Sequence, residues 1–175
     1  MSFELTPEAQ ARLEQISEAL SQQTQPQELF EKIMDAALEL TGADRGFLIL
    51  VKPGVGIDVK VARNVRREQI EHPKFQVSRG IIFETLKTGR TKLVEDAKDD
   101  QQLSERRSIT ALRLASVICV PLKAGRSLMG VLYLDHRLKR SLFGPKHVLL
   151  MEAFAEKAAA AIEAAGGGEP PAADP

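Results

Sequence analysis

The stretch 116–135, SVICVPLKAGRSLMGVLYLD, decides the fold, because it predicts two buried strands joined by a tight turn at residues 124–126. The first strand alternates two apolar sets, Ile118, Val120 and Leu122 against Val117 and Cys119. The second strand does the same with Leu128, Leu132 and Leu134 against Met129, Val131 and Tyr133. Strands that are apolar on both faces belong in a sheet covered on both sides. The sequence therefore predicts a sheet with helices, loops or a ligand packed on each surface.

The composition is that of one ordinary globular domain. The chain has 175 residues, of which 43% are hydrophobic and 27% are charged, enough to form a proper core. Lys plus Arg and Asp plus Glu both total 24, so the formal net charge is zero. A neutral chain offers no strong basic field for nucleic acid, and we interpret the cluster Arg63, Arg66 and Arg67 as solvated surface. Direct binding of nucleic acid is therefore not expected.

Cysteine usage and hydropathy indicate the compartment. A single cysteine, Cys119, excludes a disulfide within one chain and fits a reducing environment. No apolar run approaches the roughly 20 residues needed to span a bilayer, and residues 1–10 lack the charged-then-apolar order of a signal peptide. We therefore expect a cytoplasmic protein without a membrane partner. The Gly- and Pro-rich residues 166–175 are expected to form a flexible tail or linker.

Four helices are expected around the sheet. The first begins at Thr6 and the second covers 27–41, with Gly42 as its stop signal. A short helix over 79–88 follows Ser78, a good N-cap, and the last runs from Gly144 to about residue 165. The first and last helices each carry a narrow apolar seam with spacings of four and three. The first seam is Ala9, Leu13, Ile16 and Leu20, and the second is Met151, Ala155, Ala158, Ile162 and Ala165.

Four further strands complete the expected sheet. Residues 45–51 and 57–64 are joined by the turn PGVG and predict an antiparallel hairpin. Shorter strands are expected at 75–77 and 91–94. Together with the two strands of 116–135, the sequence predicts about six strands.

The order of these elements resembles that of the GAF domain family, a group of small sensory modules. The resemblance rests on four segments in the family's order: 29–50, 78–97, 114–135 and 149–163. It implies an α+β fold with a central antiparallel sheet of about six strands, the terminal helices on one face, and a pocket with short helices on the other. The implied domains are 1–24, an N-terminal helix for dimerisation; 25–165, the sensory domain; and 166–175, the tail. The segments ELTGADRGFLIL (39–50) and VLYLDHR (131–137) are particularly similar in sequence to sensor domains of bacterial sigma-54-dependent activators, cyclases and kinases.

Catalysis and metal binding are not expected. Cys119 and the three histidines show no spacing typical of a nucleophile with its base. GAF-like enzymes that reduce free methionine sulfoxide use several cysteines, and this chain has one. Some GAF sensors of nitric oxide hold iron, for which the candidates would be Asp96, Asp99, Cys119 and Asp135, but their spacing does not establish that they converge. We interpret Asp135 as a turn or surface carboxylate. Residues for haem, bilin or cyclic nucleotide are not recognisable, so the cofactor is left open.

Small-molecule binding is the pocket chemistry that we expect. Ser78, Arg79 and Gly80 open a short helix, where free N–H groups and the Arg79 charge would hold a phosphate or carboxylate. The alternative is an ordinary capped helix with a solvated arginine. A second set of residues would line an apolar cavity or fill it: Ile82, Val94, Ile109, Leu112, Val117 and Cys119.

Two functions remain open from the sequence. The first is a regulatory sensory domain that binds a small-molecule effector. The change caused by binding would be transmitted through the terminal helices to an output module in the same or a partner chain. The two seams motivate this function, because they could pair across a two-fold axis in a homodimer, although both could equally pack within one chain. The second is a ligand-free module for dimerisation or docking, with its pocket filled by side chains.

Overall fold

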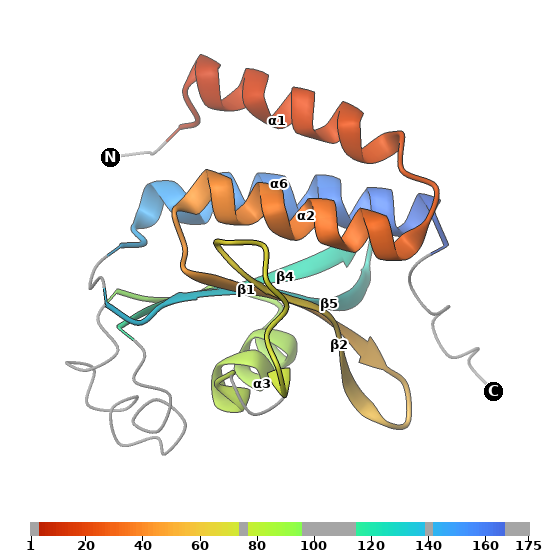
Figure 1. Cartoon of the computed structure of the whole chain (residues 1–175), viewed down its shortest axis with the longest axis vertical. Helices are drawn as coiled ribbons and strands as arrows, with labels where there is room; N and C mark the ends of the chain where they lie inside the picture. Colours follow the sequence, from red (N-terminus) through yellow and green to blue (C-terminus); the bar gives the residue numbers. More distant parts are fainter. Residues whose placement is uncertain (1–3, 74–76, 96–114, 139–141, 167–175) are drawn as a thin grey trace.

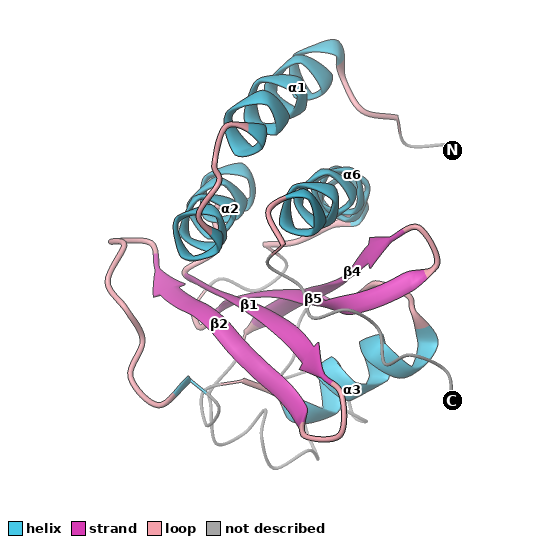
Figure 2. Cartoon of the chain, turned by 90° about the vertical axis from the view of Figure 1, so that its right-hand side faces the viewer, coloured by secondary structure: helices cyan, strands magenta, loops and turns pink. Residues whose placement is uncertain are grey.

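The computed structural model describes residues 4–73, 77–95, 115–138 and 142–166. These residues form three layers (Figures 1 and 2). On one face of a sheet lie two helices with a third stacked over them, and one shorter helix covers the other face. The helical layer consists of α1 (Pro7–Ser21), α2 (Pro26–Thr41) and α6 (Pro145–Ala164), and the opposite face carries α3 (Arg79–Thr88). Among the described helices, none combines the length and the apolar character needed to cross a membrane.

The described part of the sheet has five strands, all paired antiparallel in the order β2-β1-β5-β4-β3. The strands are β1 (Arg45–Lys52), β2 (Gly56–Asn64), β3 (Lys92–Val94), β4 (Ser116–Ala124) and β5 (Ser127–His136). The expected α+β arrangement is therefore present, with one strand fewer than the sequence predicts. Residues 74–76 of the expected strand 75–77 lie outside the described residues, and Val77 forms no strand.

The two-sided burial predicted from the hairpin is confirmed. Ile118 and Val120 of β4 belong to the core beneath the helical layer, whereas Val117 and Cys119 belong to a second core on the α3 side. Met129 is an exception, because it packs with the helix-side core and not with Val131 and Tyr133. The register of β4 and β5 shifts by one residue between Leu122 and Lys123, and a bulge of this kind turns a side chain to the other face.

Local capping signals place the helix ends. Thr6 caps α1 by accepting a hydrogen bond from the Ala9 N–H at 3.1 Å, and Ser78 lies at the N-cap of α3. Gly42 and Gly89 end α2 and α3 with φ of 72° and 66°, a left-handed conformation that favours glycine. The expected helices are therefore confirmed, with bounds that differ from the predicted ones by one residue at most.

Both apolar seams pack within the chain. Leu13, Ile16 and Leu20 of α1 are buried against the helical layer, and α1 lies over α2 and α6 (Figure 1). Met151, Ala155, Ala158 and Ile162 of α6 are buried in the same core. The buried members of these seams therefore hold α1 to α2 and α6, and α6 to the sheet, and are not available to pair across a two-fold axis. Apart from Gly166, the expected tail lies outside the described residues.

Candidate functional site

The α3 side of the sheet carries the candidate site. Its floor comes from alternate residues of the strands, and its roof from the inner side of α3. Every buried member of this group is at most 8% exposed. We call this group the α3-side cluster: Phe47, Ile49, Ala62, Val77, Ile81, Ile82, Val94, Val117, Cys119, Val131 and Tyr133. Its described residues pack closely against one another, and the larger hollows of about 860 Å³ and 610 Å³ lie elsewhere, beside α6.

One of two polar contacts at Ser78 fixes the start of α3 to this floor, and the other caps the helix. The backbone N–H of Ser78 donates to the Tyr133 hydroxyl at 3.3 Å, and the Ser78 hydroxyl accepts from the Ile81 N–H at 3.5 Å. Burial, with the nearby Asp135 charge as the next cause, raises the pKa of Tyr133 well above its ordinary value. The phenol is therefore protonated at neutral pH. Its ring packs edge-on against Phe47, with centroids 5.5 Å apart.

The structure brings together only part of the predicted site. Ser78, Ile82, Val94, Val117 and Cys119 are all buried on the α3 side. In contrast, Arg79 and Gly80 are exposed in the first turn of α3.

The first turn of α3 is therefore exposed and apart from the apolar cluster, and the Ser78 hydroxyl binds one of its N–H groups, that of Ile81. Binding of an anion at this helix start stays a prediction. The alternative, a capped helix with a solvated arginine, describes this helix start. The two remaining predicted residues, Ile109 and Leu112, lie outside the described residues.

Cys119 is a neutral thiol at the bottom of the cluster. Burial raises its pKa from 9.0 to about 12, and a hydrogen bond with Thr85 opposes this only partly. The thiolate is the nucleophile and the metal ligand, so the side chain is inert in this position. Cys119 serves as a small core residue, and its contact with Thr85 gives α3 a second polar attachment to the sheet.

A buried ion pair next to the cluster was missed by the sequence reasoning. Arg45 donates from Nε to Asp135 Oδ1 at 2.9 Å and from Nη2 to Asp135 Oδ2 at 2.7 Å. The two side chains are 8% and 0% exposed, and the guanidinium lies 5.4 Å from the centroid of the Phe47 ring. The interpretation of Asp135 as a turn or surface carboxylate is therefore wrong. Burial raises the pKa of Asp135, while the hydrogen bonds and the charge of Arg45 oppose that shift.

A sequence signal for this pair existed. Arg45 begins a strand and Asp135 lies near the end of another, and the two face each other directly in the antiparallel register of β1 and β5. Charged residues at the ends of otherwise apolar strands are rarely buried unless paired. The sequence did not reveal which strands were neighbours.

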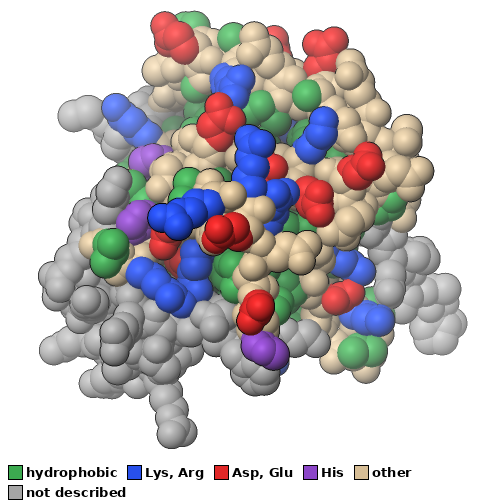
Figure 3. All heavy atoms as spheres, in the orientation of Figure 1, with side chains coloured by type: hydrophobic (Ala, Val, Ile, Leu, Met, Phe, Trp, Pro, Cys, Tyr) green, Lys and Arg blue, Asp and Glu red, His purple; other side chains and the backbone are tan. Residues whose placement is uncertain are grey.

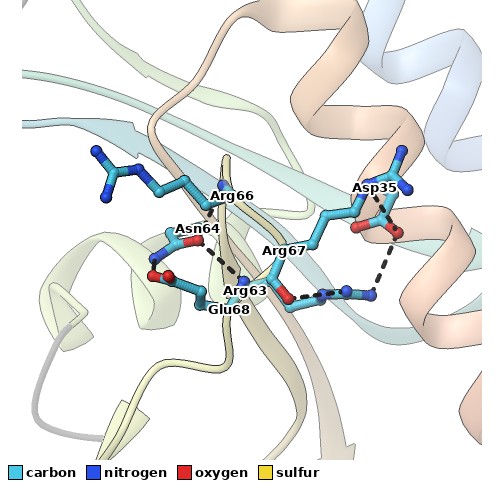
Figure 4. A network of polar contacts seen from close by, with 6 residues as sticks. All are labelled: Asp35, Arg63, Asn64, Arg66, Arg67 and Glu68. Carbon is cyan, nitrogen blue, oxygen red and sulfur yellow. Dashed lines mark hydrogen bonds and ion pairs between the residues drawn. The ribbon is translucent and has the colours of Figure 1, made fainter.

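The arginine cluster at the end of β2 is also partly internal (Figure 4). Arg63 is only 15% exposed and donates to Asp35 of α2 at 3.2 Å, whereas Arg67 is 72% exposed. Asn64 holds the following turn through bonds with Arg66 and Glu68. The prediction of solvated surface is thus wrong for Arg63. On the face in Figure 3, basic and acidic side chains are interspersed.

Metal ligands do not gather in the described ranges, where no group of three or more His, Cys, Asp or Glu side chains is placed to hold an ion. Of the four iron candidates, Asp96 and Asp99 lie outside those ranges. Cys119 is a protonated thiol, and Asp135 is engaged by Arg45. The described residues therefore do not fit such a centre.

An antiparallel sheet between terminal helices and a short α3 defines the class of protein, and the chain belongs to the GAF domain family, whose model matches residues 25–162. GAF domains are signalling and sensory domains. Helix α1 precedes the matched range. A search of curated proteins finds no match.

Solved structures with the same fold come from varied proteins. The GAF domain of an Acinetobacter phosphoenolpyruvate-protein phosphotransferase has a TM-score of 0.72 at 13% identity, covering 93% of this chain and 97% of its own. A phycoerythrobilin-bound GAF domain of a cyanobacterial phytochrome has a TM-score of 0.69 at 15% identity, with 94% and 98% covered. Free methionine-R-sulfoxide reductase of Neisseria meningitidis has a TM-score of 0.65 at 18% identity, with 95% and 97% covered. At these identities the likeness shows the fold alone.

Proposed function

We propose that this chain is a sensory domain that binds a small-molecule effector on the α3 side of its sheet. The effector would shift α3, and the terminal helices would pass the change to an output module in the same or a partner chain. The observation that carries the proposal is the α3-side cluster, an apolar floor to which a ten-residue helix is attached by two described polar contacts, at Ser78 and Thr85. Family membership supports it.

The chemistry of the described floor favours an uncharged, mainly apolar effector. Cys119 and Tyr133 are protonated at neutral pH because burial raises both of their pKa values. The Arg45 charge is matched by Asp135 in a bidentate pair. An anion brought onto this floor would lose its hydration without gaining an uncompensated positive charge, which is costly.

Native mass spectrometry of gently purified protein, together with an absorption spectrum, tests this proposal. We expect a mass increment that disappears on denaturation, and a rise in melting temperature with apolar compounds from a ligand panel, because a ligand that binds only the folded state stabilises it. A control panel of small phosphates and carboxylates should give no shift. Repeated observation of the bare mass, with no shift for any compound, would contradict effector binding.

That negative result would favour the second function, a ligand-free dimerisation or docking module. Its supporting observation is the burial of the α3-side cluster, whose fully buried members are each at most 8% exposed. The effector and docking hypotheses therefore predict opposite outcomes in the same experiment.

The proposed homodimer needs a surface other than the two seams. A groove of about 860 Å³ lies between α1 and α6 and includes exposed alanines of α6, among them Ala160 and Ala164. Small side chains permit close approach of a second helix. Light scattering should give a dimer, and Ala160→Glu should reduce it to a monomer. The matched control Ala19→Glu, exposed on α1 outside the groove, should leave the dimer intact; a monomer for the unmodified chain would end this proposal.

The remaining parts of the proposal concern the host protein. We propose no enzymatic role, since the described thiol is buried and protonated. The similarity of residues 39–50 and 131–137 to sensor domains of sigma-54-dependent activators favours transcriptional regulation in the cytoplasm. Sequencing the gene beyond this chain tests this assignment. An adjoining ATPase module of such an activator would support it, and a different output module would contradict it.

A further inference from the structure

A row of polar contacts leads from α3 around the edge of the sheet. Lys92 of β3 lies 3.5 Å from the Glu84 carboxylate of α3. Between them, the Arg90 N–H donates to the Thr88 hydroxyl at 3.2 Å, and the Thr88 hydroxyl donates to the Glu84 carbonyl at 2.9 Å. Helix α3 and its C-terminal turn thus form one unit, which reaches the start of β3 through Lys92, while β3 itself is paired with β4.

The next residue links this unit to the opposite layer. Thr91 donates from Oγ1 to Oε1 of Glu152 at 2.7 Å, although the two residues are 61 positions apart. Glu152 belongs to α6, on the other face of the sheet from α3. A solvent-exposed side-chain hydrogen bond therefore connects the roof of the candidate site with the last helix of the described chain.

Little packing accompanies this bond. A hollow of about 610 Å³ lies beneath it, between residues 89–91, the edge of β4 at Val120 and Pro121, and the Val148 side of α6. Strand β3 pairs only with residues 117–119 of β4, so it gives no cover to β4 beyond Cys119. Where side chains do not fill the space between two elements, a specific polar contact carries a larger share of their coupling.

We propose that the Thr91–Glu152 hydrogen bond is the link through which a displacement of α3 reaches α6. This inference rests on the proposed sensory function and adds its route of regulation. When α3 is seated, Thr91 restrains the first half of α6. When α3 moves away from the floor, its C-terminal turn with Thr91 follows, the bond to Glu152 lengthens or breaks, and the first half of α6 becomes easier to open.

Amide hydrogen exchange tests the link without a ligand. Tyr133→Phe removes the acceptor for the Ser78 N–H and so loosens α3 from inside. Exchange should then rise in residues 79–88, and by about two- to tenfold in residues 148–156, the range expected for the loss of one modest hydrogen bond. Thr91→Val is nearly isosteric and lacks the donor, so it should raise exchange in 148–156 by itself.

The double variant separates coupling from simple destabilisation. With Thr91→Val already present, Tyr133→Phe should still raise exchange in α3 but add nothing in 148–156. Thr91→Ser keeps the hydroxyl and should restore the response of α6. Additive effects in the double variant, or an unchanged α6 when α3 has loosened, would overturn the proposed link. Either result leaves effector binding to be decided separately by the native mass measurement.

Discussion

At the scale of single residues, burial governs the chemistry of the polar groups near the site. Arg45 and Asp135 are withdrawn from water together and satisfy each other through two parallel hydrogen bonds. Such a pair adds little net stability over apolar residues of similar size, but removal of one partner leaves an uncompensated buried charge. The pair therefore favours one register of β1 against β5, since a slipped strand would separate the charges.

The cost of an unpaired charge can be measured with Arg45→Met. We expect the free energy of unfolding in urea to fall by about 3–5 kcal/mol, and the pKa of Asp135 to rise further because its positive neighbour is gone. The double variant Arg45→Met/Asp135→Asn should cost much less than the sum of the two single variants. Strict additivity would mean that the side chains do not stabilise each other.

His147 should make stability depend on pH. Its ring accepts a hydrogen bond from the Gly144 N–H at 3.1 Å, and partial burial lowers its pKa from 6.5. The folded state therefore prefers the neutral ring, and its stabilising effect is complete above about pH 6.5 and lost as pH falls through the lower folded pKa. Urea unfolding at pH 7.5 and 5.0 should show this loss, and His147→Gln should reduce it. The exposed His72→Gln control should retain the wild-type difference.

The thiol of Cys119 should resist alkylation in the folded protein. Its pKa of about 12 leaves almost no thiolate at pH 8, and the side chain is fully buried. Iodoacetamide at pH 8 should label the protein only after urea unfolds it, with a single adduct by mass. Rapid labelling of the folded protein would show that the α3-side cluster opens to solvent.

At the scale of elements, two strands approach each other closely at a glycine. A methyl group on Gly130 of β5 would overlap the carbonyl oxygen of Ile49 and crowd Leu50, both backbone contacts of β1. Backbone in a central strand has little room to give. Gly130 therefore permits the β1–β5 pairing, and its φ is not in the positive range.

Gly130→Ala should lower the free energy of unfolding by about 3 kcal/mol or more, at or above the upper end for overpacking. Gly144→Ala is the matched control, because nothing lies within 4 Å of the added methyl group and φ there is −130°. Circular dichroism during urea unfolding measures both. Equal stability of the two variants would show that the strands can separate at Gly130 without loss.

At the scale of the whole molecule, α1 is part of the same packed body as the sheet. Leu13 and Leu20 are each 2% exposed in the helix-side core, although α1 precedes the part of the chain that the family model matches. Helix α1 is thus connected to the domain both by the chain and by its side chains in the helix-side core. We expect one cooperative unfolding transition that includes α1.

Leu13→Ala should destabilise the whole domain by about 2–5 kcal/mol, the usual range for a buried leucine. The loss of free energy of unfolding should be the same in two measurements: helix content followed by circular dichroism, and protection of the strand amides from hydrogen exchange. Leu138→Ala, at a residue that is 86% exposed, should change stability by less than about 0.5 kcal/mol. A loss confined to α1, with the sheet unaffected, would show that α1 unfolds independently.

The sequence by itself determined the parts that follow local rules. Alternation in 116–135 predicted a sheet with two buried faces, and the caps Thr6, Ser78 and Gly42 predicted where helices begin and end. These features depend on neighbours a few residues away, so they can be recognised without knowing the fold. They also carried the resemblance to GAF domains.

Only the tertiary structure decided what depends on distant partners. It paired Arg45 with Asp135, turned Met129 to the helix side through a bulge, and placed Arg79 in solvent away from the apolar floor. It also packed both seams within one chain and joined Thr91 to Glu152 across the sheet edge. Strand register and layer packing depend on all contacts of the folded chain together. A local sequence pattern does not specify which distant residue a given side chain will contact.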